Sequence, residues 1–239
     1  MIQVFDDFDR LSQAAAALIV AQACQAVASR GRFCLALSGG RTPQLTYQKL
    51  AQVPFLEQVP WAQVHVFWGD ERCVPEDDIH SNVRMAREAL LEHVPLPPEQ
   101  IYPMACAGDS VAAARGYEKL LQRFFPPGEP SFDLILLGLG EDGHTASLFP
   151  GTRSLQETVR LVTALHLPEE KFIRLTLTPP VINRSRLAVF LVSGQNKAEI
   201  LHRVLSAPQG RFPAQLIAPH ETRWLIDKEA TSRIESTQI

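Results

Sequence analysis

The chain has 239 residues, of which 46% are hydrophobic and 21% charged, and its formal net charge is −3. These values are typical of a globular protein with a sizeable core and exclude a disordered chain. The slightly acidic balance argues against a protein that binds nucleic acid through bulk positive charge, so an anionic ligand needs a local basic pocket. We expect one domain over residues 1–239, with a polar tail that frays from about residue 228.

Four cysteines, Cys24, Cys34, Cys73 and Cys106, form no C-x-x-C pair and show no zinc-ligand spacing. Because the chain shows no signal sequence, we expect the four cysteines to be reduced thiols. The N-terminus is acidic and resembles no secretory or transit signal. The apolar stretch 14–28 is too short and too rich in small residues to span a bilayer. We therefore expect a cytoplasmic protein with no membrane partner.

Helical and strand patterns alternate along the chain. The expected helices cover 8–29, a segment capped by Thr42 with Pro43 at its first position, 81–93, 110–125 and 197–205. The expected strands cover 33–37, 64–68, 132–137, 161–164, 173–177, 187–192 and 223–226. This alternation predicts an α/β, Rossmann-like fold with a mostly parallel sheet, helices on both faces and a small inserted region around 151–180.

Polar turns that contain glycine follow four of the expected strands. These turns are 38–42, 69–72, 138–144 and 193–197. The carboxyl ends of parallel strands lie on one edge of a sheet, and open α/β sheets bind their ligands there. We therefore expect the four turns to meet at one site.

The first turn, Ser38, Gly39, Gly40, Arg41 and Thr42, leads directly into a helix. Its glycines allow backbone N–H groups to approach a ligand, and the helix N-terminus favours an anion. The spacing matches neither a P-loop nor G-x-G-x-x-G. The turn therefore favours the phosphate of a small metabolite over a nucleotide. A plain strand-to-helix turn is the alternative.

Charged residues mark two of the other turns. Asp70, Glu71 and Arg72 follow Gly69, and Lys197 stands at the end of the last turn. An arginine can hold a phosphate or a carboxylate with two hydrogen bonds. A solvated charge cluster and a surface lysine are the alternatives, and only the shared sheet edge favours a site.

His144 follows Asp142 by two residues, in a turn loosened by glycines. Imidazole has an ordinary pKa of about 6.5, and a neighbouring carboxylate can orient the ring. The pattern therefore predicts a general base that takes a proton from water. The alternative is a structural histidine. A metal role is disfavoured because no second ligand set accompanies His144.

These motifs together resemble the glucosamine-6-phosphate isomerase/6-phosphogluconolactonase family. The segments that carry the resemblance are 38–43, 69–75, 81–82, 138–151 and 193–197, in the expected order. The lactonase branch implies hydrolysis of 6-phospho-D-glucono-1,5-lactone to 6-phospho-D-gluconate in the oxidative pentose phosphate pathway. It implies a sugar-phosphate lactone as partner, no nucleic acid, no cofactor and a monomer or small homo-oligomer.

The resemblance implies catalytic roles for three residues. His144 matches the base that activates water, Asp142 the acid that sets the state of the histidine, and Asp70 the acid at the substrate. It also implies binding roles for Arg72 and Lys197.

Further binding residues follow from the same resemblance. Asn82 matches a motif position at the substrate, and the turn 38–42 matches the phosphate loop. Arg174 is a further candidate for contact with an anion.

The isomerase/deaminase branch is the main alternative function. Its members place a glutamate five residues after the histidine, where this chain has Phe149. An aromatic ring cannot shuttle protons on a sugar, so Phe149 favours the lactonase branch. A sugar-phosphate sensor without catalysis is the other alternative, and it predicts a damaged base, whereas Asp142 and His144 are both present.

Overall fold

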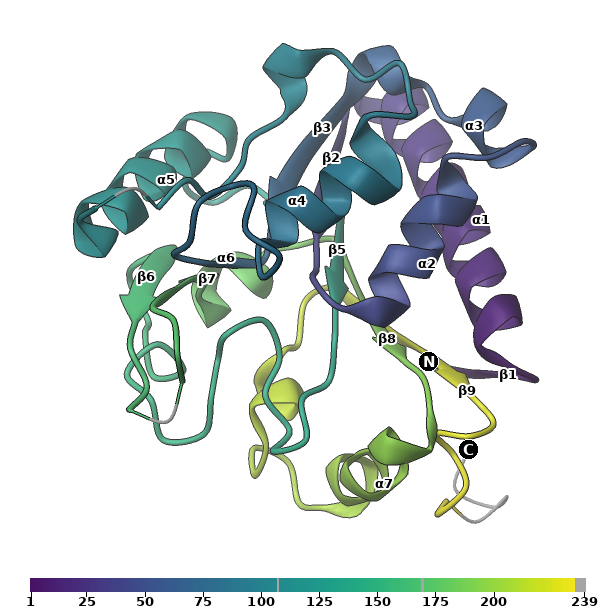
Figure 1. Ribbon diagram of the computed structural model, residues 1–239, viewed down its shortest axis with the longest axis vertical. Helices are drawn as coiled ribbons and strands as arrows, with labels where there is room; N and C mark the ends of the chain where they lie inside the picture. The colour runs from purple at the N-terminus through teal and green to yellow at the C-terminus, as the bar shows by residue number, and fades with distance from the viewer. Residues whose placement is uncertain (107, 169, 235–239) are drawn as a thin grey trace.

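The computed structural model describes residues 1–106, 108–168 and 170–234, and its centre is a parallel sheet (Figure 1). The strand order of this six-stranded sheet is β1-β9-β8-β5-β2-β3, and every pair in it is parallel. The strands are β1 (Ile2–Phe5), β2 (Phe33–Leu37), β3 (Val64–Trp68), β5 (Leu134–Leu137), β8 (Leu187–Val192) and β9 (Glu221–Asp227). The α/β fold with a mostly parallel sheet is confirmed.

A small antiparallel sheet lies beside the main one. Its three strands have the order β4-β7-β6. They are β4 (Asp70–Arg72), β6 (Val162–Leu165) and β7 (Arg174–Leu177). The inserted region predicted around 151–180 supplies β6 and β7, whereas the segment predicted as the turn 69–72 supplies β4. The turn prediction was wrong because β4 owes its strand structure to pairing with β7, far along the chain.

Helices cover both faces of the main sheet, as predicted. In Figure 1, α1 and α2 lie on one side, and α5 and α6 lie on the other with the small sheet. The helices are α1 (Phe8–Arg30), α2 (Arg41–Leu50), α3 (Phe55–Gln58), α4 (Asn82–Ala86), α5 (Ser110–Phe124), α6 (Pro179–Ile182) and α7 (Ala198–Ser206). The short helices are η1 (Trp61–Gln63), the π-helix η2 (Arg87–Leu91), η3 (Pro98–Gln100), η4 (Gln195–Lys197) and η5 (Pro213–Leu216).

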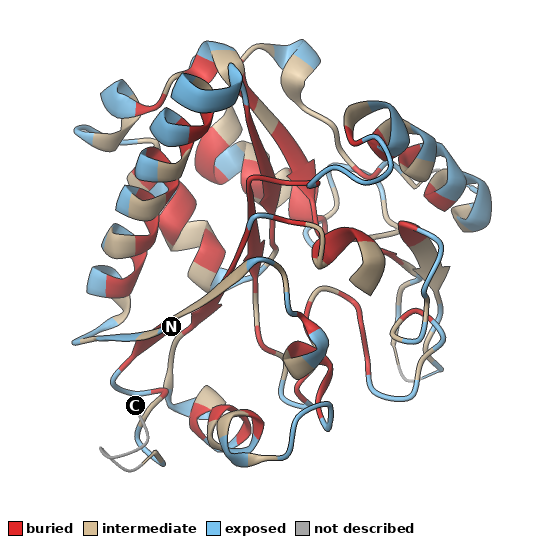
Figure 2. Cartoon of the chain, turned by 180° about the vertical axis from the view of Figure 1, so that it is seen from behind, coloured by how far each residue is buried: buried red, intermediate tan, exposed pale blue. Residues whose placement is uncertain are grey.

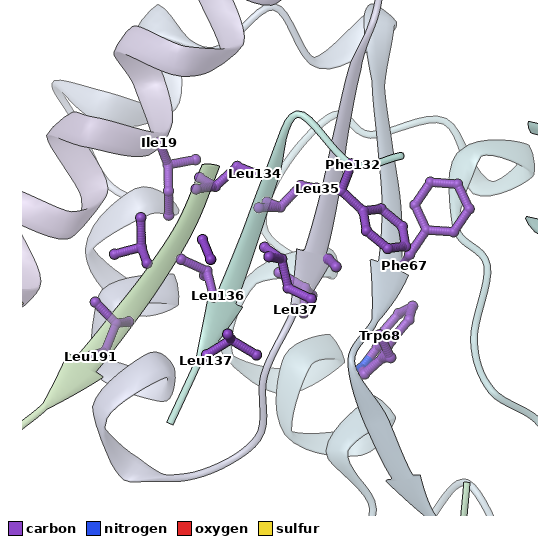
Figure 3. Packing of buried hydrophobic residues seen from close by; sticks show 14 of the residues in the cluster. Ile19, Leu35, Leu37, Phe67, Trp68, Phe132, Leu134, Leu136, Leu137 and Leu191 are labelled. Carbon is purple, nitrogen blue, oxygen red and sulfur yellow. The ribbon is translucent and has the colours of Figure 1, made fainter. Parts of the chain in front are cut away.

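The core lies between these layers and along the sheet (Figure 2). All residues of β2, β5 and β8 are buried, which is the pattern of parallel strands covered on both faces. In Figure 3, Ile19 of α1 points toward the sheet, and Phe67 of β3 lies near Phe132, with ring centroids 5.4 Å apart. Full burial of such a side chain contributes about 1.5–3 kcal/mol, so this packing stabilises the sheet whose strands carry the loops of the site.

Helix α1 is long and apolar enough, by length and composition alone, to cross a membrane. In this structure one face of the helix packs into the core. Leu11, Ala15, Ile19 and Ala23 recur at helical spacing and are at most 1% exposed. Asp7 caps its N-terminus by accepting from the backbone N–H of Arg10. The apolar stretch 14–28 therefore packs against the sheet.

The structure differs from the predicted elements at several places. Helix α2 begins at Arg41 with Gly40 as its N-cap, and no side chain caps it, so the prediction of Thr42 as the cap was wrong. Gly40 takes this place because its φ of 101° is strained for other residues. The predicted helix 81–93 divides into α4 and η2, although Ser81 caps it as expected. The edge strand β1 was not predicted.

The chain does not fray where the polar tail was expected to begin. Ala230 is fully buried, and its backbone N–H donates to Asp227. Residues 228–234 form turns against the body of the protein. The expectation was wrong there because Asp227 is a buried acceptor for this turn. The rest of the predicted tail, 235–239, lies outside the described residues.

Two of the predicted thiols are joined in a disulfide, Cys73–Cys106. Cys73 follows β4, and Cys106 follows a segment in which the backbone N–H of Tyr102 donates to Val66 of β3. This packing brings the two Cα atoms to 4.9 Å. The prediction of four reduced thiols was wrong because a sequence separation of 33 residues gives no local pairing signal. Cys24 and Cys34 are free.

We expect loss of this disulfide to destabilise the protein. Closing a loop of this length removes chain entropy from the unfolded state, which corresponds to about 3–4 kcal/mol. Urea unfolding of Cys73→Ser should therefore show a lower free energy of unfolding than wild type, and reduced wild type should match the variant. Cys24→Ser is the control. Equal midpoints for wild type and Cys73→Ser would contradict the prediction.

Candidate active site

The four segments predicted as glycine-bearing turns, one of which contains β4, meet at the carboxyl ends of β2, β3, β5 and β8, as the sheet predicts. They border a cavity of about 520 Å³ and an adjoining one of about 570 Å³. Most of the predicted site residues line the first cavity. They are Ser38, Gly39, Gly40, Asp70, Arg72, Asn82, Asp142, His144 and Lys197. Arg41 and Thr42 line only the second, and Gly39, Gly40 and Lys197 border both.

His144 is held by the turn that follows β5. Its Nδ1 lies 2.5 Å from Oδ1 of Asp142, which also accepts from the backbone N–H of His144 at 3.0 Å. When Nδ1 donates to the carboxylate, the lone pair of the neutral ring is on Nε2. The ring also packs against Phe149, with centroids 4.1 Å apart. The turn therefore presents an oriented imidazole to the cavity.

The backbone around His144 is shaped for this ring position. A Cβ on Gly140 would overlap the imidazole, and the N–H of Gly140 donates to the carbonyl of His144 at 2.8 Å. Ala146, which also lines the cavity, has a φ of 48°. A non-glycine residue in this left-handed region costs about 1–3 kcal/mol and is typical of functional sites. Sequence reasoning did not single out Ala146.

Asp70 is 6% exposed and lies in the cavity wall. Its Oδ2 accepts from Ser147 Oγ at 2.6 Å and lies 3.9 Å from Arg174 Nη1. The amide nitrogen of Asn82 is 3.4 Å from Oδ1. Asp70 thus joins three segments that lie far apart in the sequence. Ser147 was not recognised as a site residue because only this tertiary contact distinguishes it.

Arg72 and Asn82 form one hydrogen-bonded unit. Arg72 Nη1 donates to Asn82 Oδ1 at 2.6 Å and to the carbonyl of His80 at 3.1 Å. Asn82 Nδ2 donates to the carbonyl of Asp70 at 2.9 Å. A Cβ on Gly39 would overlap the Asn82 amide, so the glycine permits this close approach. The sequence motif around 81–82 therefore supports the arginine.

Glu71 belongs to the same charged triplet as Asp70 and Arg72, but its side chain has a structural role. It is 3% exposed and accepts from the backbone N–H groups of Asn82 and Val83 and from Ser81 Oγ. Burial raises the pKa of Glu71, and the backbone hydrogen bonds oppose this shift. Its carboxylate fixes the start of α4 against β4.

The turn after β8 places Lys197 at the junction of the two cavities. Asp227, 1% exposed, accepts from the backbone N–H of Gly194 at 3.1 Å and from Ser193 Oγ. Gly194 has a φ of 96°, which favours glycine. At the turn after β2, Tyr47 Oη accepts a hydrogen bond from the backbone N–H of Ser38 and donates one to the carbonyl oxygen of Ser38. Asp227 and Tyr47 are supports that the sequence motifs did not reveal.

Across the described ranges of the chain, no group of three or more His, Cys, Asp and Glu side chains is placed to hold a metal ion. The cavity instead combines a histidine–carboxylate pair with cationic side chains and glycine backbone. This arrangement can bind a small anion and present it to a base.

A family model described as glucosamine-6-phosphate isomerases/6-phosphogluconolactonase matches residues 6–226. The chain belongs to this family. It is 44% identical over 227 residues to a 6-phosphogluconolactonase of Synechocystis sp., and the match covers 92% of both chains. It is 39% identical over 245 residues to the Mycobacterium tuberculosis 6-phosphogluconolactonase, with 98% of both covered.

Solved structures of proteins from this family are also similar to the chain. The chain superposes on 6-phosphogluconolactonase from Trypanosoma cruzi with a TM-score of 0.84 at 30% identity, covering 98% of this chain and 96% of that one. A monomeric glucosamine-6-phosphate deaminase has a TM-score of 0.81 at 24% identity, with 97% and 98% covered. At that identity the deaminase shows the shared fold alone.

Proposed function

We propose that this protein hydrolyses 6-phospho-D-glucono-1,5-lactone to 6-phospho-D-gluconate, as an enzyme of the oxidative pentose phosphate pathway. The observation that carries the proposal is the contact between His144 Nδ1 and Asp142 at 2.5 Å in a cavity that Lys197 also lines. Family membership and the identity to 6-phosphogluconolactonases over nearly the whole chain support it.

In this mechanism the base is Nε2 of His144. It takes a proton from water, and the hydroxide oxygen forms a bond to C1 of the lactone. The carbonyl electrons move to oxygen and give a tetrahedral oxyanion. On its collapse the bond from C1 to the ring oxygen breaks, and protonated His144 returns the proton to the departing alkoxide. Asp142 stabilises the imidazolium between the two transfers.

The phosphate lies between Lys197 and the Ser38–Thr42 loop. Backbone N–H groups at Gly39 and Gly40 and the N-terminus of α2 attract the anion, and Lys197 adds a charge. Arg72 is a further anion ligand, because Asn82 fixes one of its nitrogens. Binding the phosphate holds C1 near His144, which lowers the entropic cost of the attack.

The direct test is turnover of 6-phosphogluconolactone by purified wild type, measured as acid release and corrected for spontaneous hydrolysis. We expect hydrolysis well above the spontaneous rate. Turnover at the spontaneous rate would refute the lactonase proposal and favour a sugar-phosphate sensor.

The shared fold with a deaminase makes glucosamine-6-phosphate the second substrate to assay. Phe149 occupies the position of the glutamate in the deaminase branch, and its ring packs on His144. Because this chain has a phenyl ring instead of a carboxylate at that position, it has no group there to shuttle protons on the sugar. We therefore expect no fructose-6-phosphate. Appreciable fructose-6-phosphate would favour the isomerase/deaminase function instead.

We expect Lys197→Ala to raise KM for 6-phosphogluconolactone by about 10-fold, the equivalent of one charge-assisted hydrogen bond. KM for unphosphorylated gluconolactone should not change, because the lysine would contact only the phosphate. Steady-state kinetics with both lactones measures the difference, and Lys49→Ala, at a residue that lines neither cavity, is the control. An equal rise for both lactones would contradict a phosphate contact.

A further inference from the structure

One wall of the first cavity carries a carboxylate–guanidinium pair that the proposed mechanism does not use. Glu170 and Arg174 both line the cavity, and Glu170 Oε2 lies 2.6 Å from Arg174 Nη2. The Glu170 side chain is 30% exposed, whereas that of Arg174 is 13% exposed. The carboxylate is therefore open to a ligand, and the guanidinium is the more deeply buried partner.

Arg174 is fixed on several sides. Its backbone is in β7, paired with Arg72 of β4, and its Cζ lies 5.5 Å from the centre of the Phe149 ring. Nη1 lies 3.9 Å from Asp70 Oδ2. Phe149 in turn packs on His144, so its ring links Arg174 to the base. Glu170 thus lines the same cavity as His144 and is joined to the wall that carries the base through Arg174 and Phe149.

The chemistry of the proposed substrate restricts what Glu170 can bind. A carboxylate only accepts hydrogen bonds. The phosphate, the C1 carbonyl and the ring oxygen of the lactone offer no donor, whereas its hydroxyl groups do. Within the described residues, Glu170 accepts a side-chain hydrogen bond from Arg174 alone, so Oε1 can accept from a ligand.

We propose that Glu170 is a specificity-determining residue that accepts a hydrogen bond from a hydroxyl group of the lactone ring, with Arg174 as its positioning residue. This inference rests on the proposed lactonase function. The planar guanidinium holds the carboxylate in one orientation. It also balances the negative charge of Glu170 near the oxyanion that develops at C1. The site would therefore select polyhydroxylated phospholactones over deoxy analogues.

The test compares kcat/KM for 6-phosphogluconolactone and its 2-, 3- and 4-deoxy analogues. Wild type should prefer the parent over at least one analogue by about 10- to 100-fold, since a site built to bond a hydroxyl leaves its acceptor unpaired without it. In Glu170→Ala that preference should fall to about twofold or less. Arg174→Lys, which keeps the charge but loses the planar fork, should reduce the same preference.

The matched control is Glu88→Gln, which breaks an Arg84–Glu88 pair of the same i,i+4 spacing on the surface. It should keep the wild-type preference. An equal loss of kcat/KM for all four lactones in Glu170→Ala, or an unchanged preference, would overturn the specificity role. Wild type without hydrolysis of the parent lactone would refute the proposed function itself and this inference with it.

Discussion

His144→Ala is expected to lower kcat for 6-phosphogluconolactone hydrolysis by about 10²–10⁴-fold, the usual contribution of a positioned general base. Alanine cannot take the proton from water or return it to the departing alkoxide. Binding of the phosphate does not need the imidazole, so KM should change little. Asp142→Asn should lower kcat by a smaller factor, because the contact at 2.5 Å loses its charge while the ring nitrogens remain.

Initial rates at saturating lactone, corrected for spontaneous hydrolysis, measure this effect. His220→Ala is the matched control, since His220 is exposed and outside both cavities. It should keep the wild-type kcat. If His144→Ala retained full turnover, His144 would not be the base.

Gly140→Ala is expected to reduce kcat by a factor close to that of His144→Ala while the protein stays folded. The new methyl group would overlap the His144 ring. The ring must then move, and it loses its alignment with Asp142. A displacement of about 1 Å at a reacting group costs on the order of 10²-fold in rate. Comparison of kcat with the thermal midpoint separates this effect from unfolding.

Gly116→Ala is the control for the glycine substitution. Gly116 lies in α5, and apart from its chain neighbours and its own helix backbone no atom of the described residues lies within 4 Å of a Cβ built there. We expect unchanged kcat and a stability gain of about 0.5–1 kcal/mol, because alanine restricts the unfolded chain and favours the helix. Normal kcat in Gly140→Ala would show that the ring can relax without loss of function.

Local sequence patterns predicted most of the main sheet. The apolar run 33–37 coincides with β2, because a buried parallel strand needs continuous hydrophobic residues, and the alternating segment 64–68 coincides with β3. The convergence of the four turns followed from strand polarity alone. The relation between Asp142 and His144 was also predictable, since the two are only two residues apart.

Contacts between distant segments were not predictable in this way. Nothing local distinguishes Asp70 from Glu71, yet Asp70 lines the cavity and Glu71 is bonded to the start of α4. The side chains of Asp70 and Glu71 point in opposite directions because both residues belong to the strand β4, which forms only by pairing with β7. In a strand, successive side chains point to opposite faces, so the tertiary pairing assigned the two carboxylates to different environments.

The sequence by itself therefore determined the fold class, the edge of the sheet that carries the site and the histidine–carboxylate pair. These depend on periodicity and on neighbours along the chain. Only the tertiary structure decided the Cys73–Cys106 disulfide, the contact of Ser147 with Asp70 and the placement of the Glu170–Arg174 pair in the cavity that His144 lines. These depend on strand register and loop packing, which bring together residues that have no relation in sequence.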